Sequence, residues 1–374
     1  MAGASARAQT KSDAGYLIYL LGGDTTMAGR YSLNQDNFDV WVVARPNVSV
    51  TKLKGTLTAS GELQSAEGYT YKPVPGKDSQ LLVTYKLYLK DDSTIIEQTR
   101  GRDVSIQRFA GRGMTANGIG VAFRYMLPFW SHYAPKRVGD SIVSGHLTLG
   151  VNKKLTVKRT SKNDLSAFST VMGRISMRLD KNGRLESIDA LGSSWNVTAK
   201  TSRHLDLEQL AARYAQEELQ GGGMRAINQP DSVIATIQDA RIKIYYSRPQ
   251  ARGRVIFGNV VPWDRFWRTG ANAATRLVTD KPLSFGGKEL PAGTYSIFTM
   301  PSKSGWTIMF NSRANVWGTE YDPSFDVLRV PMQTFIKPEY REMMTIEVAP
   351  SPAGGTLHIT WEHTSAAVSF EVIR

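Results

Sequence analysis

The residue types best suited to ligand chemistry lie between Arg241 and Phe310. Arg248 and Arg254 flank a proline in the segment Y-S-R-P-Q-A-R-G-R, and Arg268 and Asn272 lie in W-R-T-G-A-N. Arginine offers a planar fork of N–H donors, and asparagine offers a donor and an acceptor. These side chains could therefore bind a carboxylate, a sugar or a neighbouring carbonyl. The arginines beside the proline could equally clamp their own loop, and the spacing does not decide between these roles.

Five tryptophans form a second group suited to recognition: Trp263, Trp267, Trp306, Trp317 and Trp361. Their rings could stack on sugars or fill the core of a β-sandwich. We expect the core role for most of them, because aromatic side chains are ordinarily buried in such folds. Trp263 and Trp361 remain ligand-binding candidates.

Glu362 completes the set of ligand-binding candidates. Together with Asp264 it could supply two carboxylates across a cleft. The five histidines show no H-E-x-x-H spacing, the chain has no cysteine, and a G-x-S-x-G elbow, a phosphate loop and a dinucleotide fingerprint are all missing. We assign no catalytic residue, metal or cofactor. A non-catalytic role is favoured, and an enzyme stays open because a site assembled from distant strands leaves no local motif.

A second concentration of chemistry is the segment Arg124–Arg137, R-Y-M-L-P-F-W-S-H-Y-A-P-K-R. Two prolines interrupt any strand there, which predicts a loop. Its aromatic side chains either pack beneath a sheet, the ordinary outcome, or anchor a partner. The partner-docking candidates are Arg124, Tyr125, Phe129, Trp130, Tyr133, Lys136 and Arg137.

The formal net charge is +13, which favours an anionic partner. Clustered arginines carry much of it, namely Arg100, Arg102, Arg108, Arg112 and Arg124. Since a nucleic-acid-binding motif is missing, we expect no nucleic acid partner. The expected partner is a protein with an acidic surface, first an integral-membrane complex, with an anionic lipid surface as the second choice.

The elements that must position these residues are mostly strands. Residues 12–203 show short apolar or alternating runs such as Val40–Ala44 and Leu81–Leu89, which predict an antiparallel meander or half-barrel. Asn182-Gly183 favours a type I′ hairpin turn. The segment Leu205–Leu219 has helical periodicity and is followed by three glycines, so residues 204–228 are predicted to be a linking helix and a Gly-rich linker. Residues 229–374 form the second β domain, which is predicted to be sandwich-like.

The amino terminus suggests the location. Residues 1–11 contain Ala4-Ser5-Ala6 and Ala6-Arg7-Ala8, which are typical of the end of an export signal, with a disordered leader as the alternative. The longest apolar run, Tyr16–Leu21, is too short to span a bilayer. We expect a periplasmic or otherwise extracytoplasmic protein that meets a membrane only from outside.

The C-terminal motifs also carry a resemblance. They are Y-S-R-P-x-x-R-G-R-x-I-F-G at residues 246–258, W-R-T-G-A-N-x-A-T at 267–275 and L-P-A-G-T-Y-S-I-F-T at 290–299. With them, the sequence from Asn228 onward resembles the bacterial domain-of-unknown-function family 2911. The resemblance implies an all-β, secreted or envelope-anchored domain without an established activity. The family usually has a glutamate where this chain has Ala273, so a binding or structural role becomes the stronger expectation.

Three functions follow from these patterns. The first is a non-catalytic exported docking subunit, such as a membrane-extrinsic accessory subunit of a larger membrane complex. The second is a carbohydrate-binding or small-anion-binding module at Arg268 and Asn272. The third is a hydrolase acting on an envelope substrate. We place the docking subunit first because catalytic motifs are sparse and the charge suits docking.

Overall fold

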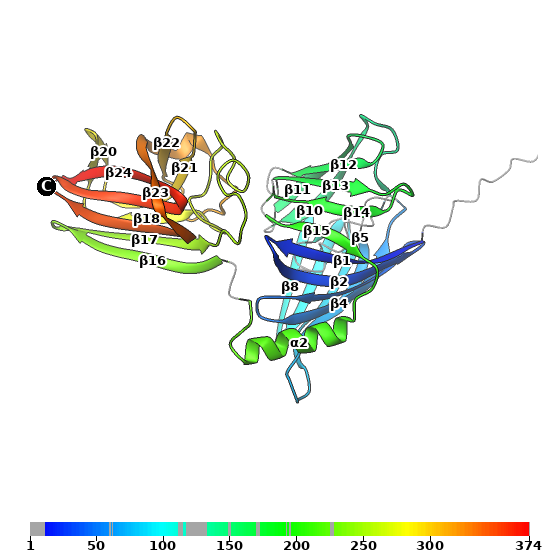
Figure 1. Cartoon of the computed structure of the whole chain (residues 1–374). Coiled ribbons are helices and arrows are strands. Elements are labelled where there is room, and N and C mark those ends of the chain that lie inside the picture. Colours follow the sequence, from blue (N-terminus) through cyan, green and yellow to red (C-terminus); the bar gives the residue numbers. More distant parts are fainter. Residues whose placement is uncertain are drawn as a thin grey trace, which may run out of the picture. The chain divides into compact units, whose positions relative to one another are not determined.

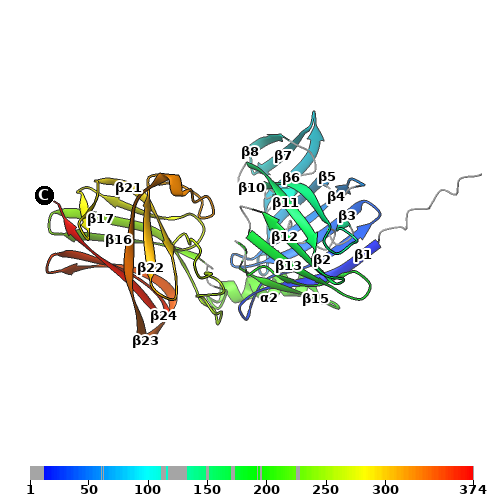
Figure 2. The same cartoon turned by 90° about the horizontal axis from the view of Figure 1, so that it is seen from above.

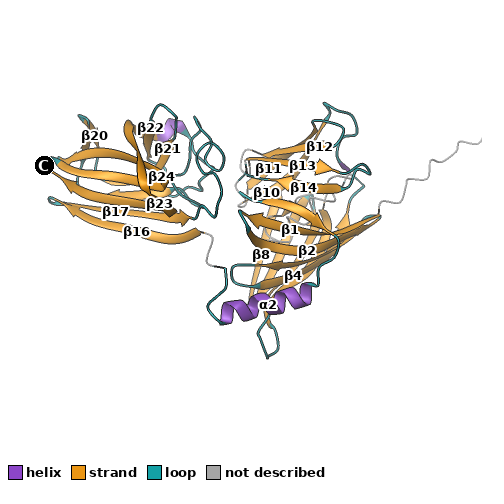
Figure 3. Cartoon of the chain, viewed as in Figure 1, coloured by secondary structure: helices purple, strands orange, loops and turns teal. Residues whose placement is uncertain are grey.

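The structure, a computed structural model, describes residues 12–59, 61, 63–110, 115–116, 133–148, 151–169, 173–191, 193, 196–224 and 228–373. The chain contacts divide it into two compact units, Met1–Arg225 and Ala226–Arg374, here called unit 1 and unit 2. Both units are built mainly of antiparallel strands, which confirms the predicted fold class (Figures 1 and 3). Among the helices of the described residues, none has the length and apolarity needed to cross a membrane.

Within the described residues, unit 1 forms one sheet of 15 strands that grows outward in both directions from β1. One half runs from β2 to β8, the other from β15 back to β9, and β9 pairs with β10 in parallel. The sheet curls until β8 lies against β11, close to its opposite edge (Figure 2). The strands are β1 (Ser12–Leu21), β2 (Asp24–Asn34), β3 (Asn37–Ala44), β4 (Ser49–Leu57), β5 (Leu63–Lys72), β6 (Gln80–Lys90), β7 (Ser93–Arg100), β8 (Asp103–Ala110), β9 (Thr115–Ala116), β10 (Ser141–Thr148), β11 (Val151–Arg159), β12 (Asp164–Ser169), β13 (Gly173–Leu179), β14 (Leu185–Asp189) and β15 (Thr198–Ser202).

Alternation along the strands gives this sheet a buried inner face and a polar outer face. On the outer face, an alternating row of charges crosses the strands β3 to β7, with each residue directly opposite the next: Asp39, Lys54, Glu67, Lys86 and Glu97. The Nζ of Lys54 lies 2.9 Å from the carboxylate of Glu67. Opposite charges directly across neighbouring strands attract each other and favour this pairing of the strands. The row therefore fixes the register without burying apolar surface.

Helix α2 (Leu207–Leu219) packs on the outer face of unit 1. Asp206 caps its amino end by accepting a hydrogen bond from the backbone N–H of Gln209. The helix therefore begins at Leu207, two residues later than the sequence predicts. Its buried residues Leu207, Ala211 and Tyr214 pack with Val43 and the valines of the β3–β4 region. At its carboxyl end the Glu218 carboxylate accepts a hydrogen bond from the backbone N–H of Val48 at 2.9 Å. The helix is therefore part of unit 1.

The turn between β13 and β14 differs from the predicted type. A type I′ turn needs positive φ at both central residues. Here Gly183 has φ +79°, whereas Asn182 is not among the residues with positive φ. The carboxylate of Asp180 instead accepts hydrogen bonds from the backbone N–H groups of Asn182 and Arg184, at 2.8 and 2.9 Å. The hydrogen bonds to the Asp180 side chain therefore stabilise a turn of a different type from the predicted one.

Unit 2 is a second antiparallel sheet, in which the described strands run in the order β16-β17-β18-β21-β22-β23-β24-β19-β20. The long strand β23 pairs with β22 and β24, and it also contacts β16 and β17, so the sheet wraps around one core. The elements are β16 (Asn228–Ile237), β17 (Ala240–Pro249), β18 (Thr275–Thr279), β19 (Leu283–Phe285), β20 (Lys288–Leu290), β21 (Gly293–Met300), β22 (Trp306–Asn311), the 3₁₀ helix η2 (Pro323–Phe325), β23 (Asp326–Ser351) and β24 (Gly354–Val372).

Candidate functional site

Arg248, at the end of β17, acts as an internal clamp. Its guanidinium donates hydrogen bonds to the Asp231 carboxylate at 3.1 Å, to the Met344 carbonyl at 3.0 Å and to the Thr345 hydroxyl at 2.9 Å. Asp231 belongs to β16, and the other two acceptors belong to β23. The clamp therefore joins three strands, and of the two roles open to Arg248 the structure shows the internal one.

Arg254 is also held by its own loop. It donates hydrogen bonds to the backbone carbonyls of Ala251 at 3.0 Å and Gln250 at 2.7 Å. Burial, followed by the neighbouring Arg252, lowers the pKa of Arg254 to about 10, and Glu342 opposes this shift. The structure thus uses this arginine to shape the R-G-R loop.

An aromatic cluster lies behind this loop. Phe257 is its centre, with ring centroids 5.0 Å from Trp306, 6.0 Å from Trp263, 6.3 Å from Trp267 and 6.4 Å from Trp361. Trp306 and Trp361 are fully buried, whereas Trp263 and Trp267 are half-buried. The indole of Trp361 donates a hydrogen bond to the Glu342 carbonyl at 3.2 Å. Trp361 is therefore a core residue.

Glu362 lies next to this core, and its close carboxylate neighbour is Glu342. Burial and, to a smaller extent, Glu342 raise the pKa of Glu362, while a hydrogen bond from the backbone N–H of Ile256 and the nearby His363 lower it. The hydroxyl of Tyr340 donates to the Glu342 carboxylate at 3.3 Å. A carboxyl group with a raised pKa beside a second carboxylate is the arrangement from which a general acid can be built.

The raised pKa of Glu362 predicts a pH-dependent stability. The folded protein binds this proton more readily than the unfolded chain, so stability is lost as the pH rises from the ordinary glutamate pKa through the raised one. Glu362→Gln removes this cost, and we expect the variant to melt a little above the wild type at pH 7. The difference should disappear near pH 4, measured by thermal unfolding. The exposed Glu339→Gln is the control, and a pH-independent difference for Glu362→Gln would contradict the assignment.

Arg268 and Asn272 lie in the loop before β18. The Arg268 side chain is largely buried, which lowers its pKa, and its Nε has no hydrogen-bond partner within the described part of the chain. A Cβ added at Gly318 would overlap the Arg268 side chain. Asn272 is exposed, has φ +60° and accepts a hydrogen bond from the Asn228 amide at 3.3 Å. The two predicted residues therefore lie in the same loop, but the Arg268 side chain is largely buried and Asn272 is exposed.

A cavity of about 520 Å³ lies beside this loop in unit 2. Its lining includes Tyr245 and Ser247 of β17, Ala273 and Arg276 near the start of β18, and Asn315 and Trp317 of the loop after β22. Ala273 and Trp317 of this lining stand in the sequence motifs, whereas Arg276 and Asn315 do not. Arg276 sits in an ordinary strand pattern, T-R-L-V-T, which carries no functional signal.

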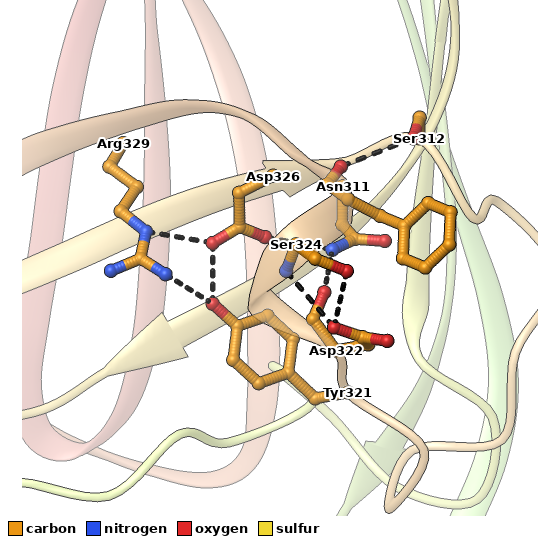
Figure 4. A network of polar contacts seen from close by, with 8 residues as sticks. Asn311, Ser312, Tyr321, Asp322, Ser324, Asp326 and Arg329 are labelled. Atoms are coloured by element: carbon orange, nitrogen blue, oxygen red, sulfur yellow. Dashed lines mark hydrogen bonds and ion pairs between the residues drawn. The ribbon is translucent and has the colours of Figure 1, made fainter.

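A polar network holds the cavity's outer loop in place (Figure 4). The hydroxyl of Tyr321 donates to Asp326 at 2.5 Å, and Arg329 donates to the same carboxylate at 2.8 Å. The amide of Asn311 donates to the other oxygen of Asp326 and to the Asp322 carbonyl, at 2.8 and 2.9 Å. Burial and the bond to Asp326 raise the pKa of Tyr321, so this hydroxyl stays a donor at neutral pH. The network fixes both ends of the loop that carries Asn315 and Trp317.

The predicted docking loop is largely outside the described residues, which leave out 117–132 and with them Arg124, Tyr125, Phe129 and Trp130. Tyr133, Lys136 and Arg137 are described. Lys136 and Arg137 are exposed, and Tyr133 is half-buried, with its ring against Gly61. Burial and then Asp36 raise the pKa of Tyr133 to about 12.

The edge strand β8 carries an exposed apolar surface that its ordinary strand pattern does not reveal. Val104, Ile106 and Arg108 lie on the outer face, opposite Thr99, Glu97 and Ile95 of β7. Val104 is 62% and Ile106 is 64% exposed. On the neighbouring strands β4 to β7, the residues paired in line with these two are polar or charged, apart from Tyr69. The charge row described above therefore ends on an exposed isoleucine at the sheet edge.

Comparisons with known proteins agree with the resemblance seen in the motifs. Residues 228–370 match the family model described as Protein of unknown function (DUF2911), and the matched segment runs from the start of β16 into β24. Comparisons with curated proteins and with solved structures gave no match. The family description names no activity, so function has to be argued from the geometry.

Proposed function

We propose that the protein is a non-catalytic docking subunit whose edge strand β8 binds an acidic segment of a larger, membrane-associated protein complex. The observation that carries this proposal is the pair of exposed apolar side chains, Val104 and Ile106, on the outer face of that strand. Exposed apolar groups in a contiguous patch are typical of interaction sites.

The position of β8 supports the same role. It is the last strand of its sheet, with β7 as its hydrogen-bonded neighbour in the described part of unit 1. Because the sheet curls until β8 lies against β11, the proposal rests on the exposed side chains of β8 and not on a strand added to its backbone. Natural edge strands are commonly protected by charges or by short length. β8 has eight residues and presents Val104 near its start and Ile106 near its centre, between the charged Asp103 and Arg108.

Charge complementarity defines the partner. The exposed Arg100 and Arg102 precede the apolar pair and Arg108 follows it. Arg108 lies 3.9 Å from Asp91, and both side chains are more than half exposed, so this ion pair is weak and can be exchanged for a partner carboxylate. The net charge of +13 would speed the encounter with an acidic surface. The periplasmic, membrane-extrinsic location is part of the proposal and rests on the A-x-A pattern in residues 1–11.

The test is a pull-down from solubilised bacterial membranes with a Val104→Thr/Ile106→Thr double variant. Threonine keeps the β-branched shape but removes apolar contact, so we expect recovery of a defined complex to fall at least about tenfold, the size of a hot-spot loss. The control is Ile234→Thr, because Ile234 lies on the edge strand β16 and is 60% exposed.

The control variant should recover the complex as well as the wild type, and all three proteins should have the same melting temperature. Recovery of the complex by the double variant at the wild-type level would overturn the proposal. So would recovery of the wild type without any partner.

A further inference from the structure

The cavity of unit 2 has the features of a ligand site that is independent of the docking strand. Its volume, about 520 Å³, lies in the range of small-molecule pockets. β17, the segment around Ala273 and the loop 314–317 supply most of its walls, and the Tyr321–Asp326–Arg329 network holds that loop. Pro230 and Asp231 of β16 complete the lining, and the Asp231 carboxylate is paired with Arg248 at 3.1 Å.

Arg276 is the cation of this cavity. It donates one hydrogen bond, to the Asn315 side chain at 2.9 Å, and its guanidinium lies 4.8 Å from the centroid of the Tyr245 ring. Its Nε is enclosed, which puts it out of reach of a ligand, and Arg276 makes no ion pair with any carboxylate in the described part of the chain. The N–H groups of the two terminal nitrogens that Asn315 does not take stay available for an acceptor that enters the cavity. Arg248, by contrast, has its donors committed to the strand clamp.

The other walls suit a ring that carries hydroxyl groups. Trp317 supplies an aromatic surface, and the small Ala273 and Ala274 leave room beside it. Asn315 and Ser247 offer polar groups. Aromatic rings with a few convergent polar groups are the usual lining of a specific small-ligand pocket.

We propose that this cavity binds an acidic sugar, with the carboxylate on Arg276 and the ring against Trp317. The carboxylate matches the planar fork of the arginine and meets an unused donor there. The hydroxyl groups find partners in Asn315 and Ser247. A neutral sugar brings no charge to the guanidinium of Arg276, and a small carboxylate such as acetate leaves the aromatic wall uncovered.

The test measures binding of sodium glucuronate to the full chain by titration calorimetry. D-glucose is the probe without a carboxylate, and sodium acetate is the probe without a ring. We expect saturable one-to-one binding of glucuronate, with glucose and acetate at least about tenfold weaker, because a charge-assisted hydrogen bond is lost in one case and ring contact in the other. No saturable binding of glucuronate, or equal binding of glucose or acetate, would overturn the acidic-sugar site.

Two variants locate the site. Arg276→Gln removes the charge, and Ala273→Glu introduces a carboxylate and bulk into the cavity wall, so each should weaken glucuronate binding at least about tenfold. Arg313→Gln is the control, because Arg313 is exposed and outside the lining. Wild-type affinity in either folded cavity variant would contradict the assignment. Ala273 is exposed, so Ala273→Glu decides the matter if Arg276→Gln fails to fold. The pull-down through β8 should be unaffected by all three changes.

Discussion

A Trp361→Ala substitution is expected to lower the free energy of unfolding of unit 2 by about 3–5 kcal/mol. Trp361 is 1% exposed and stacks on Trp267 with ring centroids 5.9 Å apart. Its indole also binds the Glu342 carbonyl. The substitution removes a large apolar side chain from a packed cluster and leaves a cavity that the surrounding rings cannot fill.

Urea unfolding of the full chain, followed by far-UV circular dichroism, would measure this change. Trp263→Ala is the matched control, because Trp263 is half-buried and contacts the rim of the same cluster. We expect its effect to be less than half as large. A loss below about 1 kcal/mol for Trp361→Ala would contradict a core role, since that value is ordinary for a surface or rim position.

The Arg248→Met substitution is the second change with a large expected effect, about 2–3 kcal/mol. It removes three hydrogen bonds, and it leaves the Asp231 carboxylate without its cation. Hydrogen bonds to charged groups contribute about 1.5–3 kcal/mol. The side chains of Arg248 and Asp231 are both partly exposed, so solvent screens their attraction and the expected loss of stability stays at about 2–3 kcal/mol rather than above it.

A double-mutant cycle with Asp231→Asn separates the ion pair from the other bonds. If the clamp acts as described, the double variant is less destabilised than the sum of the single variants. Arg276→Gln is the control for loss of an arginine from the same unit. It removes one hydrogen bond and a contact with the Tyr245 ring, so it should cost about 0.5–1.5 kcal/mol, less than Arg248→Met. Equal destabilisation by Arg248→Met and Arg276→Gln would show that the clamp is not what stabilises these strands.

Local patterns predict the strands and the helix but not the pairing of distant strands. The alternation in Leu81–Leu89 identifies β6, and the helical spacing of Leu207, Ala211 and Tyr214 identifies α2. The pairing of β1 with β15 joins residues about 180 positions apart, Tyr16 with Ser202 for example. Such a pairing depends on the whole curved sheet, and no short motif encodes it.

The candidate sites show the same difference between local motifs and contacts of distant residues. The motif arginines Arg248 and Arg254 were found from the sequence. Arg254 is held within its own loop, but the role of Arg248 depends on Met344 of β23, 96 residues further along the chain. Arg276 and Asn315 become neighbours only through folding. Val104 and Ile106 fit an ordinary strand pattern, and their exposure follows from the position of β8 at the edge of the sheet. A docking role for Phe129 and Trp130 stays a prediction, because both lie outside the described residues.

Site-specific photo-crosslinking at β8 tests the docking proposal most directly. A photoreactive phenylalanine analogue would replace Ile106 in one protein and the equally exposed Ile234 in the other, each in the full chain and mixed with solubilised membranes. The proposal predicts a single crosslinked partner at position 106, through a peptide rich in aspartate and glutamate, and no crosslink at position 234. Absence of a crosslink at 106, or the same products at both positions, would contradict docking through β8.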